Sequence, residues 1–300
     1  MRQNNYDKRI GLFLMTFKGL KVLEAIIESN QHYLISFVCV GDDKNLVEDS
    51  SQEIIALCIK NDIQYLNRKD YISGDKVKYL LAVSWRWMIE SKGINLIVLH
   101  DSLLPRYRGF APLVNALKNG EPSIGVTALF ASENYDEGPI ISQKSIKISY
   151  PIKIRDAIQL IASAYQALVL EILQTIADDI PLQSEPQDCS NATYSLWLSD
   201  NDYFIDWNWD AQYIERFINA VGFPYGGART SLLDRTIRID DAIVLPEVKI
   251  ENRDVGKIIW FDNERPVIVC GRGLLRIDEA VFIDDNTSIL PLKKFRIRLR

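Results

Sequence analysis

An apolar run, residues 96–99, leads directly into His100, which is one of only two histidines in the chain. A short β-branched apolar run bounded by loop residues is typical of a strand buried in a parallel sheet. Side chains that carry chemistry gather at the carboxyl ends of such strands in open α/β sheets. The run therefore predicts a buried strand that ends on a candidate catalytic histidine.

A second strand is expected over residues 124–130, and it opens into an acidic turn at residues 133–138. The segment between the two strands, residues 102–109, contains proline and glycine and is expected to be a loop. Two strands of one sheet can bring their end residues together. We therefore expect His100 and Asp136 to meet there.

The first half of the chain alternates strand and helix patterns. Apolar residues predict a strand over 10–15, a turn at 16–19, a helix with apolar residues from Leu20 to Ile27, and a strand over 33–40. This order predicts a doubly wound, mostly parallel, Rossmann-like α/β sheet. No G-x-G-x-x-G follows the first strand, so a dinucleotide-binding fingerprint is absent. Further expected elements are a helix at 54–59, a short strand at 63–66, an edge strand at 140–148 and a long amphipathic helix at 154–176.

The second half has a different pattern. A helix is expected near residues 211–221, and short strands separated by turn residues from 228 to 300 predict a small antiparallel barrel. Five basic residues fall within 293–300, and we expect a strand with a charged outer face there rather than a phosphate-binding tail. Proline and polar residues at 181–190 predict a linker. The predicted organisation is a domain over 1–182, a linker over 183–195 and a domain over 196–300.

Composition and charge restrict the class of partner. Hydrophobic residues make up 47% and charged residues 25% of the chain, as in an ordinary globular protein. The net charge of −5 argues against a large nucleic-acid footprint, which needs a basic face. Residues 41–53 hold five acids and one lysine, a net charge of −4. We expect a solvated loop there, which would repel phosphates.

The four cysteines lie far apart and form no C-x-x-C pair, so neither a zinc site nor a redox motif is predicted. Cys39 is expected to be a small core residue. The N-terminal residues 1–9 lack the apolar core of a signal peptide. No apolar run is expected to reach the length of a membrane span. A reducing, cytoplasmic setting without membrane association fits these patterns.

Several motifs of the 100–138 stretch occur together in one known family. They are His100, Ser102-Leu103-Leu104-Pro105, Arg106-Tyr107-Arg108-Gly109, Pro112, Gly120, Gly125-Val126-Thr127 and Asp136-Glu137-Gly138. This set resembles the folate-dependent formyltransferases, which include methionyl-tRNA formyltransferase and the nucleotide-sugar N-formyltransferases. The family's spacing of 36 residues between histidine and aspartate is kept. One departure concerns the asparagine that the family has two residues before the histidine, because Val98 stands there.

The resemblance implies transfer of a formyl group from N10-formyltetrahydrofolate to an amine. His100 would accept the proton that the attacking amine loses, and Asp136 would orient the imidazole and stabilise its protonated form. The oxyanion of the tetrahedral intermediate needs a hydrogen-bond donor, which the family's asparagine supplies and Val98 cannot. Protonated His100 is one replacement, and Asn115 and Ser102 are candidates by their proximity in sequence.

The resemblance also implies residues that bind the two substrates. The family places a segment like residues 84–89 beside the pterin ring, and aromatic walls suit a flat heterocycle. The alternative is that Trp85 and Trp87 are core aromatics. Arg106 and Arg108 either hold the loop through carboxylates or bind a phosphate or the folate tail, and the structural role is favoured. The aromatic turn at Phe223 and Tyr225 can stack a nucleotide base. The expected donor-binding residues are Ser84, Trp85, Arg86, Trp87, Ser102, Leu103, Leu104 and Pro105, and the expected acceptor-binding residues are Arg106, Phe223 and Tyr225.

Three functions are compatible with these observations. The acidic surface favours an N-formyltransferase, expected to be a homodimer, that acts on a dTDP- or GDP-linked amino-dideoxy sugar and binds no nucleic acid. A methionyl-tRNA formyltransferase would require a basic tRNA-facing surface, which only the C-terminal tail offers. A catalytically weak homologue that binds folate or a sugar nucleotide is the third, and Val98 is its support.

Overall fold

The computed structural model describes residues 10–43, 49–73, 77–292 and 294–300. The N-terminal nonapeptide, the centre of the acidic 41–53 segment and Lys293 of the basic tail lie outside these ranges. The chain divides into two compact units, each described by itself below, and the predicted domain limits stay predictions. The first unit comprises Met1–Leu113, Ser123–Lys147 and Ala157–Leu196, and the second comprises Val114–Pro122, Ile148–Asp156 and Trp197–Arg300.

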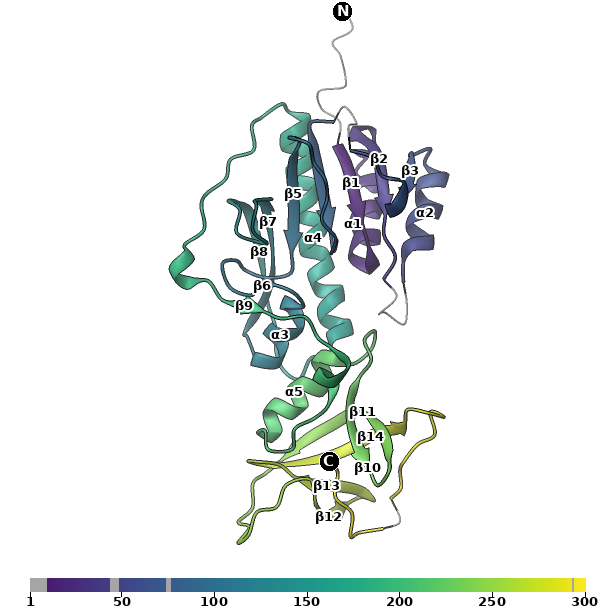
Figure 1. The fold of residues 1–300 in the computed structure, drawn as a ribbon, viewed down its shortest axis with the longest axis vertical. Helices are drawn as coiled ribbons and strands as arrows, with labels where there is room; N and C mark the ends of the chain where they lie inside the picture. The colour runs from purple at the N-terminus through teal and green to yellow at the C-terminus, as the bar shows by residue number, and fades with distance from the viewer. Residues whose placement is uncertain (1–9, 44–48, 74–76, 293) are drawn as a thin grey trace, which may run out of the picture. The chain divides into compact units, whose positions relative to one another are not determined.

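The first unit is built on a seven-stranded sheet with the order β3-β2-β1-β4-β5-β7-β8 (Figure 1). The first five strands in this order are parallel, whereas β7 pairs antiparallel with β5, and β8 pairs antiparallel with β7. The predicted mostly parallel α/β sheet is therefore confirmed. The strands are β1 (Ile10–Leu14), β2 (Ile35–Val40), β3 (Tyr65–Asn67), β4 (Tyr79–Val83), β5 (Asn95–His100), β7 (Ser123–Phe130) and β8 (Ile140–Lys147).

Helices follow the strands much as the apolar patterns predict, with one correction near the N-terminus. Residues 16–19, expected as a turn, are instead the first turn of α1. A Cβ on Gly19 would lie 3.2 Å from the Leu14 Cβ, so the missing side chain lets the helix begin against the strand end. The helices of this unit are α1 (Thr16–Glu28), α2 (Ser51–Lys60) and α4 (Ile154–Ala177), with 3₁₀ turns η2 (His32–Leu34), η3 (Arg68–Asp70) and η4 (Cys189–Asn191).

Two packed faces enclose the parallel strands. On one face α1 and α4 lie side by side, and the Gln166 side-chain amide donates to the Lys21 carbonyl at 3.0 Å. The other face carries a cluster of buried side chains that loop aromatics, among them Tyr71 and Trp85, cover. The clustered residues are Phe13, Phe37, Cys39, Leu80 and Ala82. Cys39 is the small core residue that its strand pattern predicts, and burial raises the pKa of its thiol to about 12.

The long helix α4 corrects another expectation. By length and composition it could cross a membrane, with a mean hydropathy of 1.5, so the expectation that no apolar segment reaches that length was wrong. Half of that apolar window is buried in the structure. The buried stripe includes Ile161, Tyr165 and Leu168, as in the core helix of a folded domain.

The second unit contains an antiparallel sheet with the order β10-β11-β14-β13-β12. The C-terminal segment pairs with both edges of this sheet, because Leu299 bridges Leu232 and Arg298 bridges Lys257, which closes the predicted barrel. Ile297 and Leu299 are buried, so the basic side chains of this strand-like tail alternate outward, as predicted. The elements are α3 (Pro112–Asn119), η5 (Asp200–Tyr203), α5 (Ala211–Val221), β10 (Ala228–Leu232), β11 (Arg235–Leu245), β12 (Ile258–Asp262), β13 (Arg265–Val269) and β14 (Leu274–Phe282).

Candidate active site

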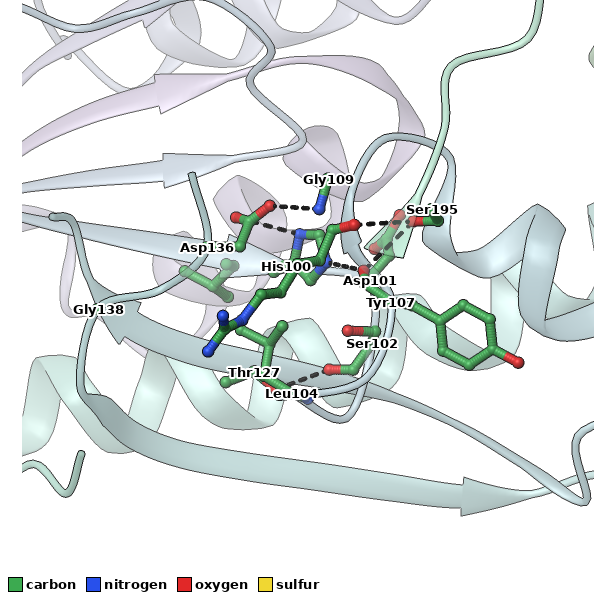
Figure 2. Close-up of polar contacts among 12 residues, drawn as sticks. His100, Asp101, Ser102, Leu104, Tyr107, Gly109, Thr127, Asp136, Gly138 and Ser195 are labelled. Atoms are coloured by element: carbon green, nitrogen blue, oxygen red, sulfur yellow. Dashed lines mark hydrogen bonds and ion pairs between the residues drawn. The ribbon is translucent and has the colours of Figure 1, made fainter. Parts of the chain in front are cut away.

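The imidazole of His100 lies at the carboxyl end of β5, as the apolar run predicts, and only 7% of the residue is exposed. Its Nδ1 is 3.4 Å from Oδ1 of Asp136, and its Nε2 is 2.8 Å from the carbonyl oxygen of Tyr107. Figure 2 shows the carboxylate and the carbonyl on opposite sides of the ring. The structure thus brings together the two residues that the sequence selects.

These contacts determine which ring nitrogen carries the proton of the neutral imidazole. A carbonyl oxygen can only accept a hydrogen bond, so Nε2 is the donor to Tyr107. The Nδ1 lone pair is then free to accept a proton, and it faces Asp136. A proton taken up at Nδ1 would lie between the imidazole and the carboxylate, where the negative charge stabilises it. The pair is therefore arranged to accept a proton at one defined atom.

The Asp136 carboxylate is held by the loop that follows His100. Its Oδ2 accepts a hydrogen bond of 2.9 Å from the Gly109 amide. Gly109 has a φ of +97°, and a Cβ there would lie 2.6 Å from the Ser195 carbonyl oxygen, so only glycine fits. Gly138 is similarly constrained, since its Cβ would meet the Phe130 carbonyl oxygen at 1.8 Å. Gly109 and Gly138 are thus both required because another part of the backbone lies where a side chain would be.

Hydrogen bonds to side chains of β7 and β8 attach the loop between His100 and Gly109 to the sheet. Thr127 on β7 donates its hydroxyl to the Ser102 carbonyl at 2.6 Å and accepts the Leu104 amide at 3.1 Å. Gln143 on β8 donates to the Leu104 carbonyl at 2.9 Å. The Ser102 hydroxyl donates to the carbonyl of Arg106. Ser102 and Leu104 are buried, so in this structure they shape the loop, and their donor-binding role stays a prediction.

The segment predicted as a linker contacts this site directly, which sequence patterns did not indicate. The Gln187 side-chain amide donates to the carbonyls of Asp136 and Gly138, at 2.7 and 2.8 Å. Its oxygen accepts a hydrogen bond of 2.8 Å from the Arg108 guanidinium. Arg108, 2% exposed, also pairs with Glu137 at 3.1 Å. Arg108 thus holds the acidic turn, which agrees with the first of the two roles considered for it.

Strand β9 (Tyr194–Ser195) extends this attachment by pairing in parallel with β6 (Arg108–Gly109). The Thr193 hydroxyl accepts the Tyr107 amide at 2.9 Å, and the Thr193 carbonyl accepts the Arg108 amide at 2.8 Å. Segments far apart in sequence therefore form one hydrogen-bonded layer around the His100 and Asp136 pair.

A second buried polar cluster lies one residue beyond His100. Asp101 pairs with Lys18 of α1 and accepts the Tyr165 hydroxyl of α4. Burial acts to raise the pKa of Asp101, but the Lys18 ammonium and the Tyr165 hydroxyl outweigh it and hold that pKa below its usual value. Burial, and then the neighbouring Asp101 charge, raise the pKa of Tyr165 well above the usual value, so it stays a neutral donor. The cluster fixes the strand end between two helices.

The aromatic residues that we expect to bind the formyl donor surround a cavity of about 420 Å³ in the first unit. Trp85 and Trp87 line it together with Tyr71 and Ser73. The Trp85 indole nitrogen and the Ser73 hydroxyl are both buried without a hydrogen-bond partner among the described residues. Buried polar atoms that lack partners are available to a ligand. An aromatic-walled cavity with such atoms fits a flat heterocycle bearing polar edges.

The remaining predicted binding residues are placed as follows. Arg86 pairs with Asp43 at 2.9 Å, and its guanidinium carbon is 5.2 Å from the centroid of the Trp87 ring. Leu103 packs over the vacant side of Gly125. Arg106 is exposed, with its guanidinium carbon 5.1 Å from the centroid of the Tyr107 ring. The second unit contains the half-exposed Phe223 and the partly buried Tyr225. Ser84 closes the end of β4 with a φ of +54°, and Pro105 follows Leu104 in the loop.

Val98 lies two residues before His100 on β5, so the two side chains share one face of the sheet. Its isopropyl group has no hydrogen-bond donor. Ser102 does not replace that donor, because its hydroxyl proton is directed at the Arg106 carbonyl. Asn115 belongs to the second unit, in α3. Protonated His100 would direct one N–H at the Tyr107 carbonyl and the other at Asp136, so neither is free to replace that donor.

The comparisons with known proteins agree with this geometry. The formyl transferase family profile matches residues 77–168, and the profile of the formyl transferase C-terminal domain matches residues 198–288. A methionyl-tRNA formyltransferase of Nitrosomonas europaea is 33% identical over 61% of this chain and 56% of its own length. A methionyl-tRNA formyltransferase of Borreliella burgdorferi is 34% identical over 66% of this chain and 62% of its own length. The chain spans about three fifths of the length of these curated relatives.

Solved structures share the fold. WlaRD, a sugar 3N-formyl transferase, has a TM-score of 0.64 at 16% identity, covering 92% of this chain and 98% of its own. An N-formyltransferase from Helicobacter canadensis has a TM-score of 0.62 at 17% identity, covering 90% and 98%. HypX from Aquifex aeolicus with tetrahydrofolic acid gives 0.60 at 18% identity, covering 92% and 44%. With the fold, the site and both profiles in agreement, the chain belongs to the folate-dependent formyltransferase family.

Gln187 provides a test of how the acidic turn is held. We predict that Gln187→Ala lowers the free energy of unfolding by about 1–3 kcal/mol, because two carbonyls and a buried guanidinium lose their partner. Amide hydrogen exchange at Gly109, whose N–H binds Asp136, should become faster. Gln183→Ala is the control, since Gln183 is exposed and contacts only its neighbour Pro181 in the described hydrogen bonds. Unchanged exchange at Gly109 would show that the turn is fixed without Gln187.

Asp101 gives a pH-dependent prediction. Its folded pKa lies below the unfolded value, so its contribution to stability is present above the unfolded pKa, about 3.9, and is lost as pH falls through the folded pKa. Asp101→Asn should lower the free energy of unfolding by about 3–5 kcal/mol at neutral pH, because Lys18 stays buried without its charge partner. The difference from wild type should narrow below about pH 4 in urea unfolding curves.

Glu24→Gln is the control for this measurement, because Glu24 forms a more exposed ion pair with Lys21 on the same helix as Lys18. Such pairs contribute about 0–1 kcal/mol. An Asp101→Asn variant as stable as wild type at neutral pH would contradict a stabilising Lys18–Asp101 pair.

Proposed function

We propose that this chain transfers a formyl group from N10-formyltetrahydrofolate to the amine of a nucleotide-linked amino sugar. The observation that carries the proposal is the buried His100 imidazole, whose Nδ1 faces the Asp136 carboxylate at 3.4 Å. An amine that attacks an acyl carbon must lose a proton, and a positioned neutral imidazole accepts it. The proposal also rests on membership of the formyltransferase family.

The donor supplies an electrophilic formyl carbon when bound. The aromatic cavity of the first unit is the proposed place for its heterocycle, because Trp85 and Trp87 provide flat walls there. The unpartnered Trp85 indole nitrogen and Ser73 hydroxyl would meet its polar edge. His100 takes the amine proton at Nδ1, and Asp136 stabilises the resulting imidazolium. Both N–H groups of that imidazolium face acceptors, the Tyr107 carbonyl and Asp136, so His100 does not replace the asparagine donor that Val98 lacks.

Charge supports the sugar acceptor. The chain carries a net charge of −5, and the described acidic residues around residues 42–53 add to a surface that phosphates of tRNA would avoid. A nucleotide sugar presents only a diphosphate, one base and one sugar, so few positive groups suffice. WlaRD, described as a sugar 3N-formyl transferase, and the Helicobacter canadensis N-formyltransferase, described in complex with dTDP-3-aminofucose, share the fold over nearly their whole length.

Methionyl-tRNA formyl transfer is the second candidate, and a specific observation favours it. The curated relatives at 33% and 34% identity are methionyl-tRNA formyltransferases. The basic side chains of the C-terminal tail would then be part of a tRNA-facing surface. The third candidate, a weak homologue, would bind the substrates without turnover.

A formylation assay separates these candidates. With N10-formyltetrahydrofolate present, we predict that dTDP- or GDP-linked amino sugars gain one formyl group by mass and that methionyl initiator tRNA does not at physiological salt. His100→Asn is the matched control and should lower the rate by about 10²–10⁴-fold, because it removes the proton acceptor without changing the fold. Formylation of methionyl-tRNA would instead establish the second candidate. Binding of both substrates without product would establish the third.

A further inference from the structure

Two exposed aromatic residues, Phe110 and Tyr135, adjoin Gly109 and Asp136 in sequence. Phe110 directly follows Gly109, whose amide binds Asp136, and Tyr135 directly precedes Asp136. Phe110 is 46% exposed and Tyr135 is 62% exposed. Their ring centroids are 6.3 Å apart with an interplanar angle of 49°. The two rings thus belong to the two segments that hold the carboxylate.

The backbone that carries both rings is fixed by hydrogen bonds. The Phe110 amide donates to the Ser195 carbonyl at 3.0 Å. The turn before Tyr135 is closed by the Ser132 hydroxyl, which donates to the Asn134 carbonyl at 2.8 Å. Asn134 also donates to Glu137 at 3.0 Å. Aromatic side chains on a fixed backbone lose little conformational entropy when they bind a ligand.

The positions of Phe110 and Tyr135 in the sequence indicate which part of the acceptor substrate their rings would contact. Resting on the proposed function, the acceptor's amine must approach Nδ1 of His100, which faces Asp136. The sugar ring bears that amine, whereas a diphosphate separates the base from it. Rings carried by the two segments that hold Asp136 would therefore meet the sugar. A deoxygenated sugar offers a C–H face with partial positive charge, and aromatic faces are electron-rich.

We propose that Phe110 and Tyr135 form the subsite for the amine-bearing ring of the acceptor. Phe110 and Tyr135 determine which sugar is accepted, while the diphosphate and base contribute affinity that is common to different sugars.

Equilibrium binding tests this subsite without turnover. Calorimetry would measure the Kd of dTDP- and GDP-linked amino sugars, and of dTDP and GDP alone, with tetrahydrofolate present in place of the formyl donor. Phe110→Ala and Tyr135→Ala should each raise the Kd of the amino sugar about tenfold or more, as loss of one stacked ring does. Their Kd for dTDP or GDP should not change. Tyr135→Phe keeps the ring and should bind like wild type.

Tyr33→Ala is the control, because Tyr33 is 61% exposed but precedes β2 at the opposite edge of the parallel sheet from the end of β5. Unchanged amino-sugar binding in both alanine variants would overturn the subsite, as would an equal loss for dTDP or GDP alone. Ring-dependent binding without any formylated product would overturn the proposed function while the subsite stands. Product formation with ring-independent binding would do the reverse.

Discussion

The hydrogen bond from the Gly109 amide to the Asp136 carboxylate is the contact on which the site depends most. It joins the loop that follows β5 to the turn that follows β7, and those two strands pair antiparallel with His100 opposite Thr127. Because β7 runs antiparallel to β5, its last residue, Phe130, lies opposite Ile97, so the turn after β7 must return toward His100. The Gly109 amide then holds the carboxylate in place, leaving its other oxygen for the imidazole.

The same hydrogen bond explains why so much of the surrounding chain is ordered around one carboxylate. Gly109 has no side chain because the Ser195 carbonyl occupies that space. Ser195 belongs to a segment that also brings Gln187 to the carbonyl of Asp136. On the opposite face of the strand end, Lys18 and Tyr165 hold Asp101. The strand end is thus held from both sides, which leaves the imidazole little freedom.

Much of this arrangement follows from sequence patterns, because strand burial and strand ends leave periodic signals. The apolar run before His100 and the glycine-containing acidic turn predicted both partners of the pair. The resemblance added their spacing and their roles. The beginning of α1 was missed because a glycine there reads as a turn, although its lack of a side chain serves helix packing.

Gln187, Lys18 and Tyr165 left no comparable signal. Each is an ordinary residue in a polar segment or an amphipathic helix, and its role arises from a partner more than 50 residues away. Such contacts depend on tertiary packing rather than on local periodicity. The polar, proline-bearing composition of the segment containing Gln187 predicted a linker, and nothing local revealed that its amide lies against the acidic turn.

The neutral His100 imidazole carries its proton on Nε2 and directs the Nδ1 lone pair at Asp136. Nitrogen-15 NMR of the histidine-labelled protein tests it directly, because the chain has only two histidines and a His32→Gln variant assigns both. At a pH where the ring is neutral, we expect a protonated Nε2 and an unprotonated Nδ1 for His100. A protonated Nδ1 with a free Nε2 would contradict it.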